Sequence, residues 1–401
     1  MSVSQTLANA FGPDSILLCP AYLVPSALIF VIVAYAFYSP ALRVKEAKIT
    51  EEESWKELEK CPDPDPFDGF DLEYLKTAKT RDHIYVNKTI RYPYFQTMAH
   101  QPMEINNWIE IDKDYLRDVN MKKGVIREHK EKALNSLPEN DDAAAELLET
   151  LVDYLPKRYP LLFEPLHGGG IWNKITNEKF PDIDKLEGVP ALMVVSRLVQ
   201  DDFLMGRERA DGHVYFTGGV VAHPGFYDFS KRIDKSLFDI HEGVPQFNEK
   251  MLLSVERTLK RFLPHQPFER SSWEMVDDYN LYHHHIADLK DGETLHESLA
   301  PKDYLFRTDH QTFRKLPRSQ AIIFGVHPIL RRLEEFADTP MIPALLAAVH
   351  DKSQEDLMRY KLAHMYQDKM LPYLRELNQS QIDRGLISGD EPVADFRDYK
   401  K

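Results

Sequence analysis

The sequence predicts an α+β fold in which a core of strands is flanked by added helices at both ends. Apolar runs rich in β-branched residues at 191–199, 213–222 and 319–327 indicate buried strands. Apolar residues recur every three or four positions at 141–155, at 247–262 and from Met341 onward, which indicates helices. Strands and helices do not alternate regularly, so the pattern disfavours a parallel sheet of βαβ units.

The N-terminal region contains an uncharged stretch that predicts a membrane anchor. Residues 16–38 carry no charge over 23 positions, about the length that a helix needs to cross a hydrocarbon core of ~30 Å. Arg43, Lys45 and Lys48 follow it, which would leave the C-terminal part in the cytosol. Residues 1–45 are therefore expected to form a single-pass anchor, for example in the endoplasmic reticulum. Pro20 and Pro25 leave a re-entrant or signal-like segment as the alternative.

The next segment, residues 46–89, is charged and contains the run CPDPDPFDGFD at 61–71. Proline and aspartate at this density favour an extended linker. Packed structure is expected from 90 to 335, and residues 336–401 are expected to form a helical extension.

Composition and missing motifs exclude several function classes. The formal net charge of −14 disfavours a nucleic-acid partner. The two cysteines, Cys19 and Cys61, form no CxxC motif, which argues against thiol redox chemistry, cysteine zinc sites and covalent haem attachment. No GxGxxG or GxxxxGK[ST] follows a predicted strand, and the HGGG at 167–170 has no GxSxG partner.

Two segments carry candidate chemistry. The stretch LFRTDHQTFRKLPRS (305–319) contains Arg307, Arg314 and Arg318. It could bind an anion, because arginine suits bidentate contacts, or it could be a solvated basic face. His241, in LFDIHEGVP, could cap or pack the following helix, or it could bind a ligand.

Six motifs in order, over roughly residues 90–330, give the chain a family resemblance. They are NNWIEIDKDY, ELLETLVDYLPKRYP, SRLVQDDF, KRIDKSLFDIHEGVP, the segment Arg270–Trp273 and RTDHQTFRKLPR. This series resembles the haem-dependent oxidative N-demethylase alpha-subunit-like family. Ser272 replaces an asparagine of the family pattern, Gly243 a proline and His310 an arginine.

The resemblance implies a PAS-like antiparallel sheet with flanking helices that binds haem b over residues 90–335. It implies an oxygenase that oxidises a methylated amine, or another small metabolite, with O2. The electrons would come from a separate reductase or ferredoxin-type donor. A non-catalytic haem or gas sensor, or a scaffold of the same fold without cofactor, are the alternatives.

The site residues follow from the resemblance and from the two cysteines, which lie outside its range. His241 is the expected axial ligand of the haem iron, with His223 as second choice. Arg270, Arg307, Arg314 and Arg318 are expected to pair with the propionates, Trp273 and Phe313 to line the pocket, and His310 and Gln311 to contact bound oxygen.

Overall fold

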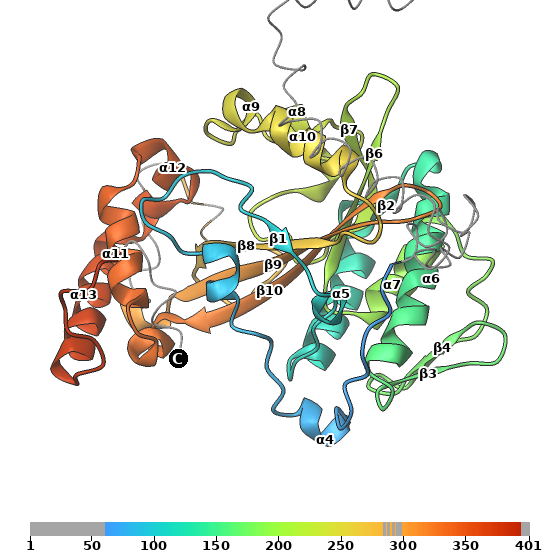
Figure 1. The fold of residues 1–401 in the computed structure, drawn as a ribbon, viewed down its shortest axis with the longest axis horizontal. Helices are drawn as coiled ribbons and strands as arrows, with labels where there is room; N and C mark the ends of the chain where they lie inside the picture. Colours follow the sequence, from blue (N-terminus) through green and yellow to red (C-terminus); the bar gives the residue numbers. More distant parts are fainter. Residues whose placement is uncertain (1–60, 284–285, 287–288, 291–292, 294–298, 394–401) are drawn as a thin grey trace, which may run out of the picture. The chain divides into compact units, whose positions relative to one another are not determined.

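A computed structural model describes residues 61–283, 286, 289–290, 293 and 299–393. Its main element is a seven-stranded antiparallel sheet in the order β1-β8-β9-β10-β6-β7-β2 (Figure 1). The strands are β1 (Gln101–Pro102), β2 (Leu134–Ser136), β6 (Asp202–Glu208), β7 (Val214–Val220), β8 (Phe268–Val276), β9 (Leu305–Lys315) and β10 (Ile322–Arg332). A small second sheet contains β3 (Phe163–Pro165), β4 (Ile171–Asn173) and β5 (Glu178–Phe180). The predicted α+β class with an antiparallel sheet is confirmed.

One face of the main sheet packs against α5 (Tyr115–His129), α6 (Asp141–Arg158) and α7 (Gly188–Leu198). Phe203, Met205 and Ile323 belong to this core cluster. Because side chains alternate along a strand, their neighbours Leu204 and Ile322 point to the other face.

The other face is covered by α8 (Leu237–Ile240), α9 (Phe247–Lys250) and α10 (Leu252–Arg261). Figure 1 shows these yellow helices above the sheet, with α5 and α7 below it. Along α10, Leu252, Val255 and Leu259 are buried against sheet residues that include Phe313 and Ile322. This apolar layer walls the cavity described below.

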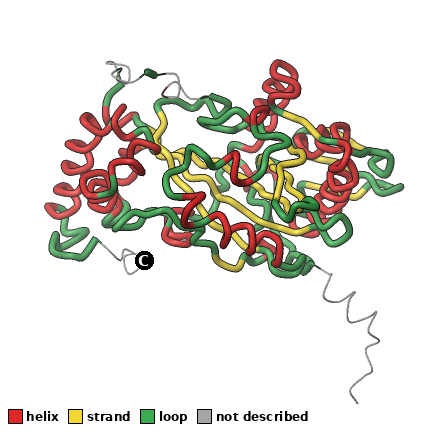
Figure 2. Tube along the Cα trace, turned by 90° about the horizontal axis from the view of Figure 1, so that it is seen from above, coloured by secondary structure: helices red, strands yellow, loops and turns green. Residues whose placement is uncertain are grey.

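A third group of helices follows the last strand: α11 (Ile342–Lys352), α12 (Glu355–Tyr360) and α13 (Gln367–Asp383). They share a core cluster with Trp273 of β8 and Phe306 of β9. Figures 1 and 2 show them gathered beyond one end of the long strands. The helical pattern from Met341 onward is confirmed.

Three further predictions from periodicity are confirmed in α6, β7 and β10, and 247–262 is helical as α9 and α10. The strand predicted at 191–199 is wrong, because these residues form most of α7. Leu192, Val195 and Leu198 are fully buried between the sheet and the neighbouring helices. A helix buried on most sides reads as a continuous apolar run, like a buried strand.

The described part of the segment expected to be a linker, residues 61–89, packs against the domain. Phe70 and Leu75 belong to the same core cluster as α6 and α7. The short helix α4 (Leu72–Leu75) is capped by Asp71, whose carboxylate accepts hydrogen bonds from the backbone N–H groups of Glu73 and Tyr74. Asp71 of this run therefore caps the start of a helix, although aspartate and proline at this density predicted an extended chain.

The predicted membrane topology needs correction. Within the described ranges, the structure contains no helix of the length and apolarity that a bilayer crossing requires. The stretch that carried the prediction, residues 16–38, lies outside the described residues. The single-pass anchor and the membrane localisation inferred from it are therefore not supported.

Candidate functional site: a histidine-bearing apolar cavity

A cavity of about 500 Å³ lies between the main sheet and helices α8–α10. That volume is in the range of roughly 300–1,000 Å³ typical of cofactor and ligand pockets. Aliphatic and aromatic side chains form much of its wall: from the helical side Ile240, Val244, Phe247, Met251, Val255 and Leu259, and from the sheet Leu204, Val214, Phe216, Phe313, Ile322 and Phe324. Together with the polar residues described below, this lining favours a large ligand that has both an extended apolar part and polar groups.

His241 follows α8 and lines this cavity. Its Nδ1 lies 2.9 Å from the backbone carbonyl oxygen of Leu237. A carbonyl can only accept a hydrogen bond, so Nδ1 carries the hydrogen and Nε2 keeps its lone pair. The ring stacks on Phe247, with centroids 3.9 Å apart and planes 9° from parallel. These two contacts fix both the tautomer and the orientation of the imidazole.

The imidazole is also kept neutral. Burial, with the cations Arg232 and Arg270 nearby, lowers the pKa of His241 to about 4. A neutral ring with a hydrogen-bonded Nδ1 and an available Nε2 is the form in which histidine binds metals. In such sites a backbone carbonyl often accepts the hydrogen bond from the other ring nitrogen and orients the ring, as the Leu237 carbonyl does here.

Cationic side chains form part of the lining. Arg91, Arg232, Arg270 and Lys361 line the cavity, together with the acids Glu274 and Asp309. Asp309 accepts a hydrogen bond of 2.7 Å from Arg307 Nε, and burial raises the pKa of Glu274. The lining therefore has more positive than negative charge and can receive an anionic group.

Arg270 is the clearest example of this excess positive charge in the lining. Burial and the neighbouring Arg91 lower its pKa to about 10. Its Nε atom is buried and makes no hydrogen bond to the described residues, and Nη1 makes only a long contact of 3.5 Å to the carbonyl oxygen of Thr97. A buried N–H group of a guanidinium that donates no hydrogen bond is costly unless a ligand pairs with it.

The structure brings five of the predicted site residues to the cavity: His241, Arg270, Trp273, Gln311 and Phe313. Gln311 donates a hydrogen bond of 3.0 Å from Nε2 to Ser272 Oγ on the neighbouring strand. Phe313 stacks between Phe268 and Phe324. Trp273 is 2% exposed, and its indole N–H makes no hydrogen bond to the described residues.

The other five lie elsewhere, and strand alternation explains two of them. His310 and Arg314 point to the opposite face of β9 from Gln311. His310 contacts Glu269, and Arg314 lies 3.9 Å from the Trp108 ring centroid and donates to Cys61 Sγ. The alternative of a solvated basic face at residues 305–319 is therefore wrong for 305–315, because β9 is buried along its length.

The remaining three are Arg307, Arg318 and His223. Arg307 is buried and bonded to Asp309 and to the carbonyl oxygen of His223. Arg318 is exposed and pairs with Glu146 and Glu149. His223 is 1% exposed, and neither ring nitrogen makes a hydrogen bond within the described part of the chain. None of the three lines the cavity.

Three cations of the lining were not predicted from the sequence. Arg91 lies in the aromatic stretch RYPYF, a composition that could have drawn attention to it. Arg232 and Lys361 lie in ordinary polar segments without such a signal. Lys361 donates to the backbone carbonyl of Trp273 at 2.6 Å, a contact between residues 88 positions apart that only the fold creates.

The chain matches the model of a known protein family. The model of the family described as "haem-dependent oxidative N-demethylase, alpha subunit-like" covers residues 99–371, more than half of the 401-residue chain. The matched segment contains the whole of β8–β10 and α8–α10, and with them His241. The chain belongs to the haem-dependent oxidative N-demethylase alpha-subunit-like family.

Proposed function

We propose that the cavity binds haem b with His241 as the axial ligand, coordinating through Nε2. The observation that carries this proposal is the hydrogen bond of 2.9 Å from His241 Nδ1 to the Leu237 carbonyl oxygen, because it leaves Nε2 as the ring nitrogen that can coordinate. Histidine is a usual ligand for haem that is held without a covalent link. Family membership supports the same cofactor.

The rest of the lining also fits haem. The apolar wall would contact the porphyrin faces, and Arg270, with Arg91 and Arg232, would meet the propionates. Of the four arginines that the sequence proposed for this role, we retain Arg270. Arg307 and Arg314 are buried with other partners, and Arg318 forms a surface ion pair.

We propose that the reaction is oxidative N-demethylation of a small amine. A tertiary or secondary methylamine, O2, two electrons and two protons give the demethylated amine, formaldehyde and water. One oxygen atom enters the formaldehyde and the other enters the water. Bound haem would supply the activation of O2.

The chain's own residues would position and shield the reactants. Trp273 and Phe313 line the cavity and limit the access of water. Gln311 uses one amide hydrogen for Ser272 Oγ, which leaves a second amide hydrogen and its carbonyl oxygen for a polar ligand in the cavity. Electrons would come from a separate reductase or ferredoxin-type protein, because the sequence carries no dinucleotide-binding motif.

The test is turnover by the haem-loaded protein with a supplied reductase and a panel of methylated amines. We expect formaldehyde, consumed O2 and electrons in the ratio 1:1:2. His241→Ala should abolish formaldehyde release, whereas His167→Ala, on an exposed loop, should not change it. A haem-loaded protein that binds O2 or CO but releases no formaldehyde would contradict the enzyme and favour the sensor.

A further inference from the structure

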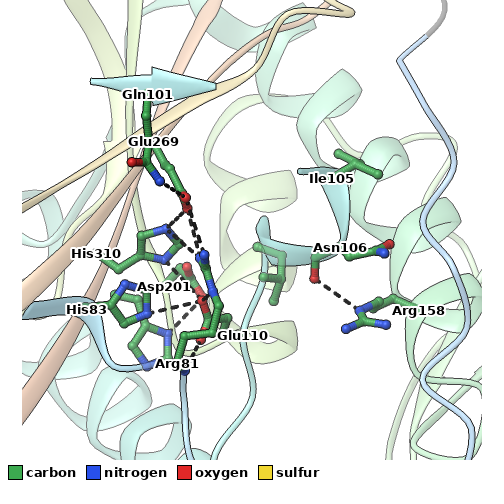
Figure 3. Close-up of polar contacts among 12 residues, drawn as sticks. Arg81, His83, Gln101, Ile105, Asn106, Glu110, Arg158, Asp201, Glu269 and His310 are labelled. Atoms are coloured by element: carbon green, nitrogen blue, oxygen red, sulfur yellow. Dashed lines mark hydrogen bonds and ion pairs between the residues drawn. The ribbon is translucent and has the colours of Figure 1, made fainter. Parts of the chain in front are cut away.

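A cluster of three buried residues lies on the face of β9 opposite the cavity. His83 begins the 3-10 helix η3 (His83–Lys88), Glu110 follows the 3-10 helix η4 (Ile105–Asn107), and His310 belongs to β9 (Figure 3). They come from segments up to 227 positions apart, since His83 precedes β1 whereas His310 lies at the middle of β9, the third strand in the spatial order of the sheet. Their side chains converge away from solvent, at 3%, 8% and 1% exposure.

The geometry points to a divalent transition-metal site formed by His83, Glu110 and His310, and we propose this site as a second centre beside the haem. One potential ligand atom from each residue lies within 4.8 Å of the others. His83 Nε2 is 3.1 Å and His310 Nδ1 is 3.9 Å from the same oxygen, Glu110 Oε1. Bonds of about 2.0–2.2 Å to one ion place tetrahedral ligand atoms roughly 3.3–3.6 Å apart, which these distances bracket.

The hydrogen bonds around His310 leave the required lone pair. Its Nε2 lies 2.8 Å from Glu269 Oε2 and 3.4 Å from Arg81 Nη2, so the contact with the carboxylate is much the shorter one. A carboxylate accepts hydrogen bonds, so Nε2 carries the hydrogen and Nδ1 presents a lone pair. That Nδ1 is buried and makes no hydrogen bond within the described residues. A carboxylate behind a ligating histidine is the usual arrangement at zinc sites.

Arg81 holds both carboxylates in place. Its backbone N–H and Nε donate to the two oxygens of Glu110 at 2.8 and 2.7 Å, and its Nη2 donates to Glu269 Oε2 at 2.8 Å. Two carboxylates against one guanidinium leave one negative charge, which a metal ion or a proton on one of the two histidines would balance. A proton can join only two of the three ligand atoms of His83, Glu110 and His310. A metal ion can accept a lone pair from all three at once.

The donor set defines the chemical class of the ion. Two imidazoles and one carboxylate suit Zn²⁺ and Fe²⁺, and the same triad occurs in zinc hydrolases and in non-haem iron oxygenases. The three residues do not line the cavity of His241, so the two centres would lie on opposite faces of β9.

The test measures metal in the full-length, haem-loaded chain by elemental analysis after incubation with Zn²⁺ or, anaerobically, Fe²⁺. Haem iron, measured separately by its pyridine haemochrome, is subtracted. We expect about one equivalent of non-haem metal per chain, as for a mononuclear site. The ion that competes better in mixtures identifies the resident metal.

Variants separate this site from the haem site. His310→Gln and His83→Gln should lose the non-haem metal and keep the Soret band, whereas His241→Ala should do the reverse. Glu269→Gln should weaken metal affinity by about tenfold without removing the site. A wild-type chain with haem iron alone, or a metal retained in both His310→Gln and His83→Gln, would overturn the proposal and leave a proton-sharing network in its place. The wild-type count decides even if a variant fails to fold.

Discussion

His310 and Gln311 are adjacent in β9, yet they serve opposite faces of the main sheet. Gln311 lines the apolar cavity and donates to Ser272, whereas His310 contacts Glu269 on the other side. From the sequence, both residues were expected to contact bound oxygen. The period of two along a strand makes that impossible for neighbours without a bulge. This relationship separates the two proposed centres and leads to the first prediction.

Gln311→Leu should keep the haem and lose turnover. The substitution removes the amide that can hydrogen-bond a ligand in the cavity, but it leaves His241 and the cationic lining unchanged. We expect formaldehyde release to fall by roughly a hundred- to a thousandfold, as for removal of one hydrogen-bond donor that stabilises developing charge. Gln379→Leu, exposed on α13, is the matched control. Equal rates for wild type and Gln311→Leu at an unchanged Soret band would remove Gln311 from the site.

Arg270→Met should change haem affinity and apoprotein stability in opposite directions. Without haem, the buried Nε of Arg270 makes no hydrogen bond to the described residues, so an apolar side chain should stabilise the apoprotein by about 1 kcal/mol. With haem, loss of a charged hydrogen bond to a propionate should raise the dissociation constant about tenfold or more. Urea unfolding of the apoprotein and haem transfer to apomyoglobin measure the two effects.

Arg318→Met is the control for that pair, because Arg318 is exposed and its ion pairs lie at the surface. It should change the free energy of unfolding of the apoprotein and the free energy of haem binding each by less than about 0.5 kcal/mol. An Arg270→Met apoprotein that is destabilised as strongly as the haem complex would show that Arg270 has a structural partner.

Phe247→Leu should weaken haem binding without changing the ligand. The Phe247 ring stacks on His241, and leucine keeps an apolar contact but removes the flat surface that orients the imidazole. We expect haem affinity to fall about tenfold, comparable to loss of another supporting group behind a ligand. The Soret maximum of the loaded variant should match the wild type, and a shifted maximum would mean that the ligand has changed.

His350 gives a prediction for acid stability. Burial lowers the pKa of His350 in α11 to about 4, below its ordinary value of 6.5. Its Nδ1 is 2.8 Å from the Leu346 carbonyl oxygen and its Nε2 is 3.2 Å from the Tyr366 hydroxyl. The hydrogen bond to Leu346 and the charge of Asp351 oppose the effect of burial on the pKa but do not cancel it. The folded state therefore binds this proton less readily than the unfolded state, and stability falls as the pH drops from 6.5 towards 4.

Wild type should accordingly lose about 2 kcal/mol more than His350→Gln between pH 7 and pH 5, because each pH unit below the unfolded pKa of 6.5 contributes about 1.4 kcal/mol. Urea unfolding of both proteins at the two pH values measures this difference. Parallel losses in the two proteins would show that His350 takes up its proton in the folded state.

The helices α6 and α10 could be predicted from the sequence because one face of each meets solvent, which leaves a helical period in the apolar residues. The strands β7 and β10 could be predicted because they are short apolar runs rich in β-branched residues. Residues 191–199 were misassigned because α7 is buried on most sides, which removes the polar positions that mark a helix. Phe70 and Leu75 were missed because proline and aspartate around them dominated the local composition.

The site could be predicted in part. His241 was found from a family motif, and its Nδ1 partner is only four residues away, so the local chain determines that geometry. The cationic lining and the His83–Glu110–His310 cluster join segments far apart in sequence. No spacing rule in a single sequence reports such contacts, because the order of strands in the sheet creates them.

The optical spectrum of His241→Ala tests the central claim most directly. We predict that wild type binds haem stoichiometrically with a histidine-ligated Soret band, and that the variant loses this band or shifts it. Added imidazole should enter the cavity and restore the wild-type spectrum in the variant. A variant whose Soret and low-temperature EPR spectra match the wild type without imidazole would contradict ligation by His241. A wild-type protein that takes up no haem would contradict the whole assignment.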